Sequence, residues 1–315
     1  MKKSSFLKRV SVLLSLALIL TLVAPVPAMA ASGGKLIKSV KEYDYYADYN
    51  DSGKVIRSKY ELSSKAEYKF DKSYPTQLKE FYYGSERGYT NTFKYKMKKN
   101  KPKSMKLKNS INKVSTKSKY NKKGQRTSTK YTNFFKRRTT AGTYKYNKNG
   151  FVTSYVYKST SKNIWGTSSS NSTTTYNYAY KMQKGLPKEV TTTYNYTYSY
   201  TDKKNPKNSY TNKSGPSTYY ATFNGKGLIT TVGRVSNGKK YPWYTVTYKI
   251  KKGKVVSAVV NDVEDYNDNG TPTKVSPMRK YTFSYTKNKA AKGRYANMIN
   301  SQLGFDSEFG TYNWY

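Results

Sequence analysis

Two segments near the middle of the chain place an aromatic residue at every second position. They read TTTYNYAYK at 173–181 and TTTYNYTYSY at 191–200, with tyrosine alternating with small, mostly polar residues. A period of two puts the rings on one face of a β-strand and the other side chains on the opposite face. The pattern predicts antiparallel strands whose buried face is built from tyrosine, and we interpret most of these rings as core rather than as ligand-stacking platforms.

A short motif, aromatic-Asn-x-x-Gly, recurs between such segments. It occurs as YNDSG at 49–53, YNKKG at 120–124, YNKNG at 146–150, FNGKG at 223–227 and YNDNG at 266–270. A related form occurs as YKMKKNK at 95–101, YKMQKGL at 180–186 and YKIKKGK at 248–254, and looser copies begin at Tyr68, Tyr200 and Tyr285. Asparagine followed by polar residues and glycine is typical of hairpin loops, because both residues tolerate positive φ.

These observations predict an all-β protein. We expect about eleven repeated units of roughly 24 residues over 43–290, arranged as an antiparallel meander of β-hairpins. The meander should form a large twisted sheet, or an open barrel or roll, with on the order of twenty strands. Tyr295, Met298, Ile299 and Gln302 follow helical spacing, which predicts a short C-terminal helix within 290–303 as part of a cap over 290–315.

The first 30 residues have the three parts of a secretory signal peptide. Lys2, Lys3, Lys8 and Arg9 precede an apolar run from Val10 to Val23, and the small-x-small triplet at 28–30 follows. Residues 31–315 are then expected to form a single exported domain, in which no later segment is apolar enough to span a membrane as a helix.

Charge is the most unusual property of the composition. The chain carries 59 Lys and Arg against 17 Asp and Glu, a formal net charge of +42. No carboxylate side chain lies between Glu86 and Glu189, whereas residues 87–188 hold 26 Lys and Arg. Such a field attracts polyanions. An AT-rich genome explains part of the lysine content, but it does not explain the depletion of acids.

Two basic segments interleave with aromatic residues. In NFFKRRTT at 133–140, Lys136, Arg137 and Arg138 follow two phenylalanines, and arginine can grip a phosphate with two hydrogen bonds. In KYKMKKNKPKSMKLK at 94–108 the densest lysines are Lys98, Lys99 and Lys101. These six residues are our candidates for polyanion binding, against the plainer interpretation that they are exposed strand ends.

Catalytic chemistry is sparsely represented. The chain has no histidine and no cysteine, which excludes a Ser-His-Asp triad, thiolate chemistry, disulfides and His-ligated zinc. The acidic segment NDVEDYNDNG at 261–270 does not follow EF-hand spacing, and we interpret it as a solvated hairpin tip. We therefore predict no enzymatic activity, no metal and no cofactor.

The motif in YKYNKNGFV at 144–152 and YADYNDSGKV at 46–55 resembles the bacterial YD-repeat (RHS-like) unit, which forms β-hairpins in long spiralling sheets. Asparagine stands here where that family usually has aspartate, at Asn50, Asn121, Asn147, Asn224 and Asn267. The resemblance implies a secreted or surface hairpin-repeat protein. The shell that large members build around toxin domains does not carry over to a chain of this length.

The sequence thus predicts a secreted, non-enzymatic β-repeat protein that is held non-covalently at a Gram-positive cell wall and binds an anionic polymer or glycan, such as teichoic acid. Nucleic acid would be bound only non-specifically. The alternatives are a protein-interaction or self-assembling surface protein, and a carbohydrate-active enzyme that uses Asp or Glu.

Overall fold

The computed structural model describes residues 35–52, 54–71, 74–83, 88–99, 101–110, 114–133, 137–148, 150–163, 165–289 and 299–303. The predicted signal peptide and Lys136 lie outside these residues. The strands are β1 (Lys35–Tyr49), β2 (Val55–Asp71), β3 (Tyr74–Tyr82), β4 (Tyr89–Lys98), β5 (Lys101–Asn109), β6 (Val114–Tyr120), β7 (Arg126–Asn133), β8 (Arg138–Tyr146), β9 (Val152–Lys162), β10 (Ser168–Gln183), β11 (Leu186–Asp202), β12 (Tyr210–Phe223), β13 (Ile229–Ser236), β14 (Lys239–Lys251), β15 (Lys254–Tyr266) and β16 (Pro272–Lys289).

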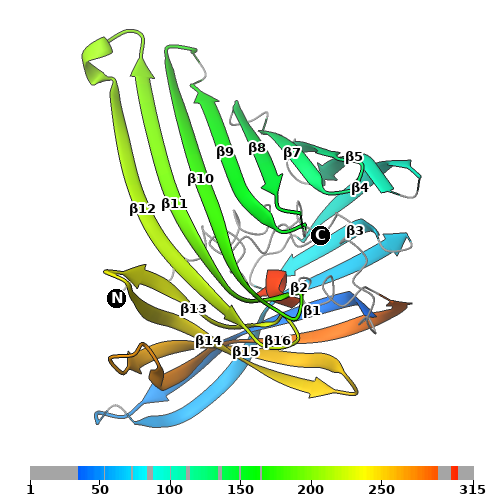
Figure 1. Cartoon of the computed structure of the whole chain (residues 1–315), viewed down its shortest axis with the longest axis vertical. Coiled ribbons are helices and arrows are strands. Elements are labelled where there is room, and N and C mark those ends of the chain that lie inside the picture. Colours follow the sequence, from blue (N-terminus) through cyan, green and yellow to red (C-terminus); the bar gives the residue numbers. More distant parts are fainter. Residues whose placement is uncertain are drawn as a thin grey trace.

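Each strand pairs antiparallel with the next one in the chain, and β1 pairs antiparallel with β16. The sheet therefore closes into a barrel, in which β9 to β12 extend well beyond their neighbours (Figure 1). A 3-10 turn, Pro206–Asn208, lies in the connection from β11 to β12. The predicted all-β meander is confirmed, and its closure removes the two exposed edges that an open sheet would have.

Alternation along the strands separates an apolar inner face from a basic outer face. In β5, Met105 and Leu107 are 1% exposed, whereas Lys106 and Lys108 between and beside them are exposed. The inner faces contribute to one core cluster that also contains Ile299 and Leu303 from the C-terminal helix. Burial of such side chains is the main favourable term in folding, at about 25 cal/mol per Å² of apolar area.

Tyrosine packing on the inner face follows the predicted pattern. Tyr144, Tyr155, Tyr176 and Tyr194 lie directly opposite one another on β8, β9, β10 and β11. Successive ring centroids are 4.6, 6.1 and 5.2 Å apart, within the range of favourable aromatic pairs. These rings pack against one another across four strands.

The repeated Asn-x-x-Gly motif forms the hairpin tips through side-chain capping. At 120–124 the Asn121 Oδ1 accepts hydrogen bonds from the backbone N–H groups of Lys123 and Gln125, at 2.9 and 3.0 Å. Gly124 adopts φ +80°, whereas Asn121 is not among the residues with positive φ. The asparagine is thus required as a short acceptor that closes an Asx-type turn rather than for a left-handed backbone.

The irregular spacing of the motif has a topological reason. In an antiparallel meander, alternate connections lie at opposite ends of the barrel. The copies at Tyr95, Tyr120, Tyr146 and Tyr180 precede connections at one end, but the copies at Tyr49 and Tyr266 precede connections at the other end. Neighbouring copies are therefore sometimes one strand apart and sometimes two, and the eleven copies correspond to sixteen described strands.

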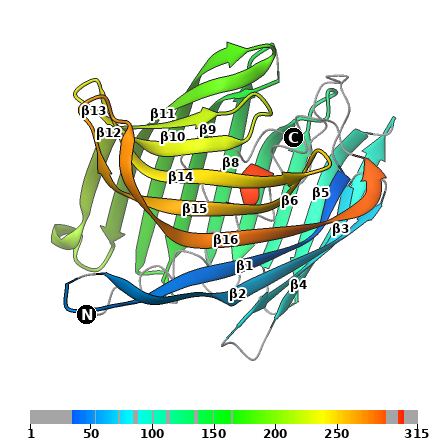
Figure 2. The ribbon, with the colours of Figure 1, turned by 90° about the horizontal axis from the view of Figure 1, so that it is seen from below.

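The C-terminal helix lies inside the barrel (Figures 1 and 2). Only residues 299–303 of the predicted segment 290–303 are described, and residues 299–302 are helical. Asn300 is fully buried; its Oδ1 accepts from the N–H of Ile229 at 2.9 Å and its Nδ2 donates to the carbonyl of Gly227 at 2.8 Å. Because Gln302 also accepts from the Tyr68 hydroxyl at 3.2 Å, the helix connects β2 with β13.

Candidate functional site

Lysines on four consecutive strands form a row on the outer face of the barrel. Lys94 of β4 lies opposite Lys106 of β5, which lies opposite Lys117 of β6, which lies opposite Lys130 of β7. All four are exposed. We call these four residues the lysine row. The same register continues through Ala141 of β8 to Lys158 of β9.

The row places like charges where they repel. Adjacent strands are about 4.7–4.9 Å apart, and like charges directly opposite one another destabilise a sheet. None of the ion pairs among the described residues includes a lysine of the row. Among the described residues the repulsion therefore has no compensating carboxylate, and an external polyanion would relieve it.

Further exposed lysines extend the row toward one end of the barrel. Lys96 and Lys119 occupy the next outward positions on β4 and β6, and the connections β4–β5, β6–β7 and β8–β9 add lysines at their tips. We call the row and the other exposed lysines of β4 to β9 near it the cationic face; it comprises Lys94, Lys96, Lys98, Lys99, Lys101, Lys106, Lys108, Lys117, Lys119, Lys122, Lys123, Lys130, Lys145, Lys148 and Lys158.

Lys136 lies outside the described residues, and the other five residues predicted from the sequence do not form one site. Lys98, Lys99 and Lys101 lie at the β4–β5 connection, on the margin of the cationic face. Arg137 and Arg138 lie at the β7–β8 connection, at the opposite end of the barrel. There Arg138 is half-buried, and its Nε donates to Ser159 Oγ at 2.8 Å.

Acidic residues gather on the other side of the barrel. On β15 and β16, Glu264 pairs with Lys274 at 2.7 Å, and this hydrogen bond lowers the pKa of the Glu264 carboxyl. On β1, Glu42 and Asp44 lie 3.5 and 3.6 Å from the guanidinium of Arg279 on β16. Within the described part of the chain, no group of three or more acidic, histidine or cysteine side chains is arranged to hold a metal ion. Charge is therefore segregated around the barrel.

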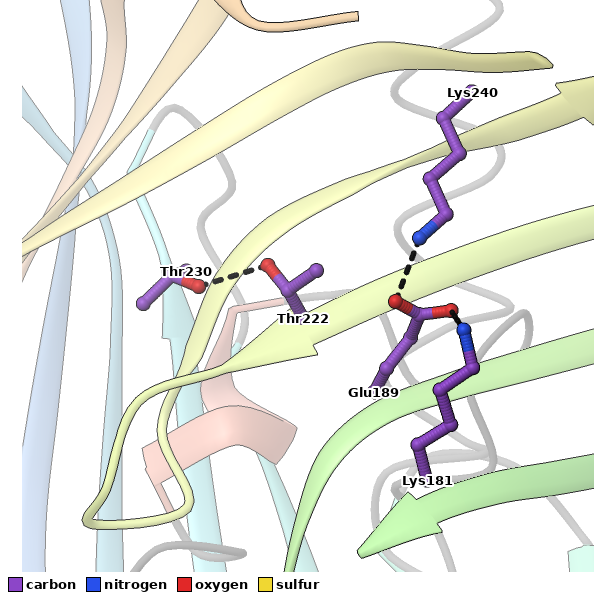
Figure 3. A network of polar contacts seen from close by, with 5 residues as sticks. All are labelled: Lys181, Glu189, Thr222, Thr230 and Lys240. Atoms are coloured by element: carbon purple, nitrogen blue, oxygen red, sulfur yellow. Dashed lines mark hydrogen bonds and ion pairs between the residues drawn. The ribbon is translucent and has the colours of Figure 1, made fainter. Parts of the chain in front are cut away.

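Glu189 is the first carboxylate after the acid-free stretch, and two lysines already neutralise it. Its two oxygens lie 3.3 Å from Lys181 Nζ on β10 and 2.6 Å from Lys240 Nζ on β14 (Figure 3). Burial alone would raise the pKa of the Glu189 carboxyl, but hydrogen bonds from Lys240 and Lys181 outweigh burial and lower it. Thr222 and Thr230 form a separate hydrogen bond nearby, at 2.9 Å. The network ties β10, β11 and β14 together.

No known family model matches the chain, and no curated protein matches its sequence. Among solved structures, a porin-like protein from Bacteroides uniformis is similar with a TM-score of 0.41 and 13% identity, covering 81% of this chain and 99% of that one. A porin-like protein from Bacteroides vulgatus gives a TM-score of 0.28 and 12% identity over 81% of this chain and 100% of that one. Likeness at this level carries no conclusion about function.

Proposed function

We propose that this chain is an exported, non-enzymatic β-barrel protein that binds an anionic phosphate polymer of the cell envelope, of the teichoic acid type, through the cationic face. The observation that carries the proposal is the lysine row, in which Lys94, Lys106, Lys117 and Lys130 stand in register and form no ion pair with any described acid. A binding role gives a reason for a row that costs stability.

A linear polyanion fits this arrangement better than a compact anion does. The row runs across the strands, and each strand adds one positive charge every 4.7–4.9 Å or so. Lysine is a point charge on a flexible stem, so it follows a polymer without demanding one phosphate geometry. Binding would then come mainly from the release of counterions, and it would weaken steeply as salt increases.

On these strands lysines face outward and apolar side chains face inward, which supports a polar environment around the outer face of the barrel. In β4 and β5 the lysines point outward, while Phe93, Met105 and Leu107 are at most 3% exposed on the inner face. Lysine at the middle of a lipid bilayer costs about 2–4 kcal/mol per residue. Separately, no helix among the described residues is long and apolar enough to cross a membrane.

The test uses the chain without its first 30 residues and isolated Gram-positive cell walls, before and after the teichoic acid is stripped. Sedimentation across a salt series measures binding. We expect strong binding at low salt, loss at high salt and loss on stripping. In the row variant K94T/K106T/K117T/K130T, the slope of log affinity against log salt should fall by about 2–3, by analogy with single-stranded nucleic acid.

A matched variant, K41T/K188T/K213T/K249T, removes the same charge from exposed lysines elsewhere on the barrel. If both variants lose affinity equally, net charge and not the lysine row controls binding. If the protein stays in the supernatant under all conditions, the proposal fails and an interaction with another protein becomes the leading alternative. Binding to single-stranded DNA with no binding to walls would overturn it as well.

A further inference from the structure

A buried arginine lies on the inner side of the same strands. Arg126 begins β7 directly after the hairpin tip at 121–125 and pairs across the ladder with Tyr120 of β6. It is 2% exposed. Its guanidinium carbon lies 5.9 Å from the ring centroid of Tyr120 and 6.0 Å from that of Tyr144, at the outer limit of a cation–π contact.

The hydrogen-bond donors at this position are not matched by acceptors. Nε and Nη1 of Arg126 and the hydroxyl of Tyr120 are buried and lack a hydrogen bond of good geometry within the described residues, although the Tyr120 hydroxyl interacts with the guanidinium and with the Ser118 side chain. Tyr146 donates its hydroxyl to the carbonyl oxygen of Arg126 at 2.7 Å, so it is engaged with the backbone and not with the guanidinium. Burial raises the pKa of Tyr120, so its hydroxyl stays protonated and can donate at neutral pH.

The charge of Arg126 is not balanced either. No ion pair among the described residues includes Arg126. The acid-free stretch from 87 to 188 also means that no neighbouring strand from β4 to β10 can supply a carboxylate. Arginine does not lose its proton in proteins, and a buried, uncompensated cation is strongly unfavourable. A negative charge that accepts several hydrogen bonds would remove both costs.

We propose that Arg126 and Tyr120 form an internal binding site for a small monovalent anion of the halide class, with chloride as the physiological ion. The site must be small because Tyr120 and Tyr144, whose ring centroids lie 5.9 and 6.0 Å from the guanidinium carbon, are each only 8% exposed. The ion would accept hydrogen bonds from the unmatched donors and neutralise the guanidinium inside the barrel wall. This site lies on the face opposite the lysine row, so it does not depend on polymer binding.

Thermal unfolding of the chain without its first 30 residues tests the site. The midpoint is measured in chloride, bromide and gluconate at equal ionic strength, so that screening of the surface charges is the same in each. We expect a saturable rise in chloride and bromide over gluconate, of about 2–4 °C once the halide exceeds its dissociation constant roughly fivefold. Y120F, which removes a single donor, should weaken the apparent affinity.

R126M replaces the cation with an apolar chain of similar length and should abolish the halide-specific rise. The matched control is R234M, because Arg234 also lies over a tyrosine ring, 5.4 Å from that of Tyr241, but is exposed. R234M should keep the rise. If R126M does not fold, the site is tested with Y120F and with a bromide-soaked crystal of the wild-type chain. An anomalous peak is expected beside residue 126 in that crystal.

Three results would overturn the inference. One is an equal midpoint in halide and gluconate for the wild-type chain, which would assign the donors to water. Another is a halide effect of the same size in R126M. A third is a halide effect that is absent from the wild-type chain and appears only in D306N/E308Q. Asp306 and Glu308 lie outside the described residues, and such a result would mean that a carboxylate of the chain itself supplies the anion in the wild type.

Discussion

Replacing Lys117 with threonine should make the protein more stable while weakening its binding to polyanions. Lys117 occupies the middle of the lysine row and faces Lys106 on one side and Lys130 on the other. K117T therefore removes two cross-strand contacts between like charges. Threonine suits a strand, so the substitution is not expected to disturb the sheet.

The size of the effect follows from these two contacts. A like-charge pair directly opposite in a sheet costs about 0.2–1 kcal/mol, so the variant should gain about 0.4–2 kcal/mol at low salt. For a domain of this size, that corresponds to a rise in Tm of about 1–8 °C. At 1 M salt the Debye length falls to about 3 Å, so the electrostatic part of the gain should disappear.

Urea unfolding of both proteins at low and high salt measures the gain. The control is K274T, which makes the same replacement on β16 but removes an ion pair with Glu264 at 2.7 Å. K274T should be neutral or less stable at low salt, and any benefit from threonine itself should appear in both variants. A K117T protein that is no more stable than wild type, or whose gain is the same at both salt concentrations, would refute the idea that the row is under electrostatic strain.

Two further substitutions test contacts inside the barrel. N300A should destabilise the protein by about 1–3 kcal/mol for each backbone group that loses its partner at the β12–β13 tip, as measured by urea unfolding; an unchanged midpoint would show that the helix does not hold that tip. E189Q should reduce stability at neutral pH. The pKa of the Glu189 carboxyl is lower in the folded state than its ordinary value of 4.5, so Glu189 contributes its full stabilisation to the folded protein above pH 4.5. That stabilisation is lost as the pH falls through the folded-state pKa. The difference between wild type and E189Q should therefore shrink as the pH of the unfolding measurement falls below 4.5, and a difference that does not change with pH would contradict the assignment.

The fold could be predicted largely because its local signals agree. The alternation at 173–181 and 191–200 identified strands, and the Asn-x-x-Gly motif identified hairpin tips that the structure places at 121–125 and 147–151. Closure could not be predicted, because the pairing of β1 with β16 joins residues such as Ser39 and Ser284, and no local pattern encodes that distance.

The lysine row was missed because a site on a sheet depends on register. Lys106 lies in the basic segment 94–108 and Lys117 lies outside both basic segments, and only the pairing of β5 with β6 places them side by side. The tips at 98–101 and 121–125 do not reveal the row, because a bulge beside each tip, at Lys96/Met97 and at Lys119/Tyr120, shifts the register of the flanking strands by one residue. Lys106 and Lys117 face each other across the β5–β6 connection, which carries no copy of the motif. Density of charge along the chain instead selected Arg137 and Arg138, which lie at the far end of the barrel.

The seam between β1 and β16 also has a consequence for the order in which the chain can fold. Fifteen of the pairings join consecutive strands and can form as each hairpin becomes available, whereas the sixteenth requires both ends of the described barrel. Contacts of such high sequence separation form slowly, because loop-closure entropy must be overcome first. A chain that emerges from a translocation channel N-terminus first would therefore hold β1 as an unpaired edge until β16 arrives. Outward lysines on the strands between them would keep such partly folded chains apart by mutual repulsion during that interval.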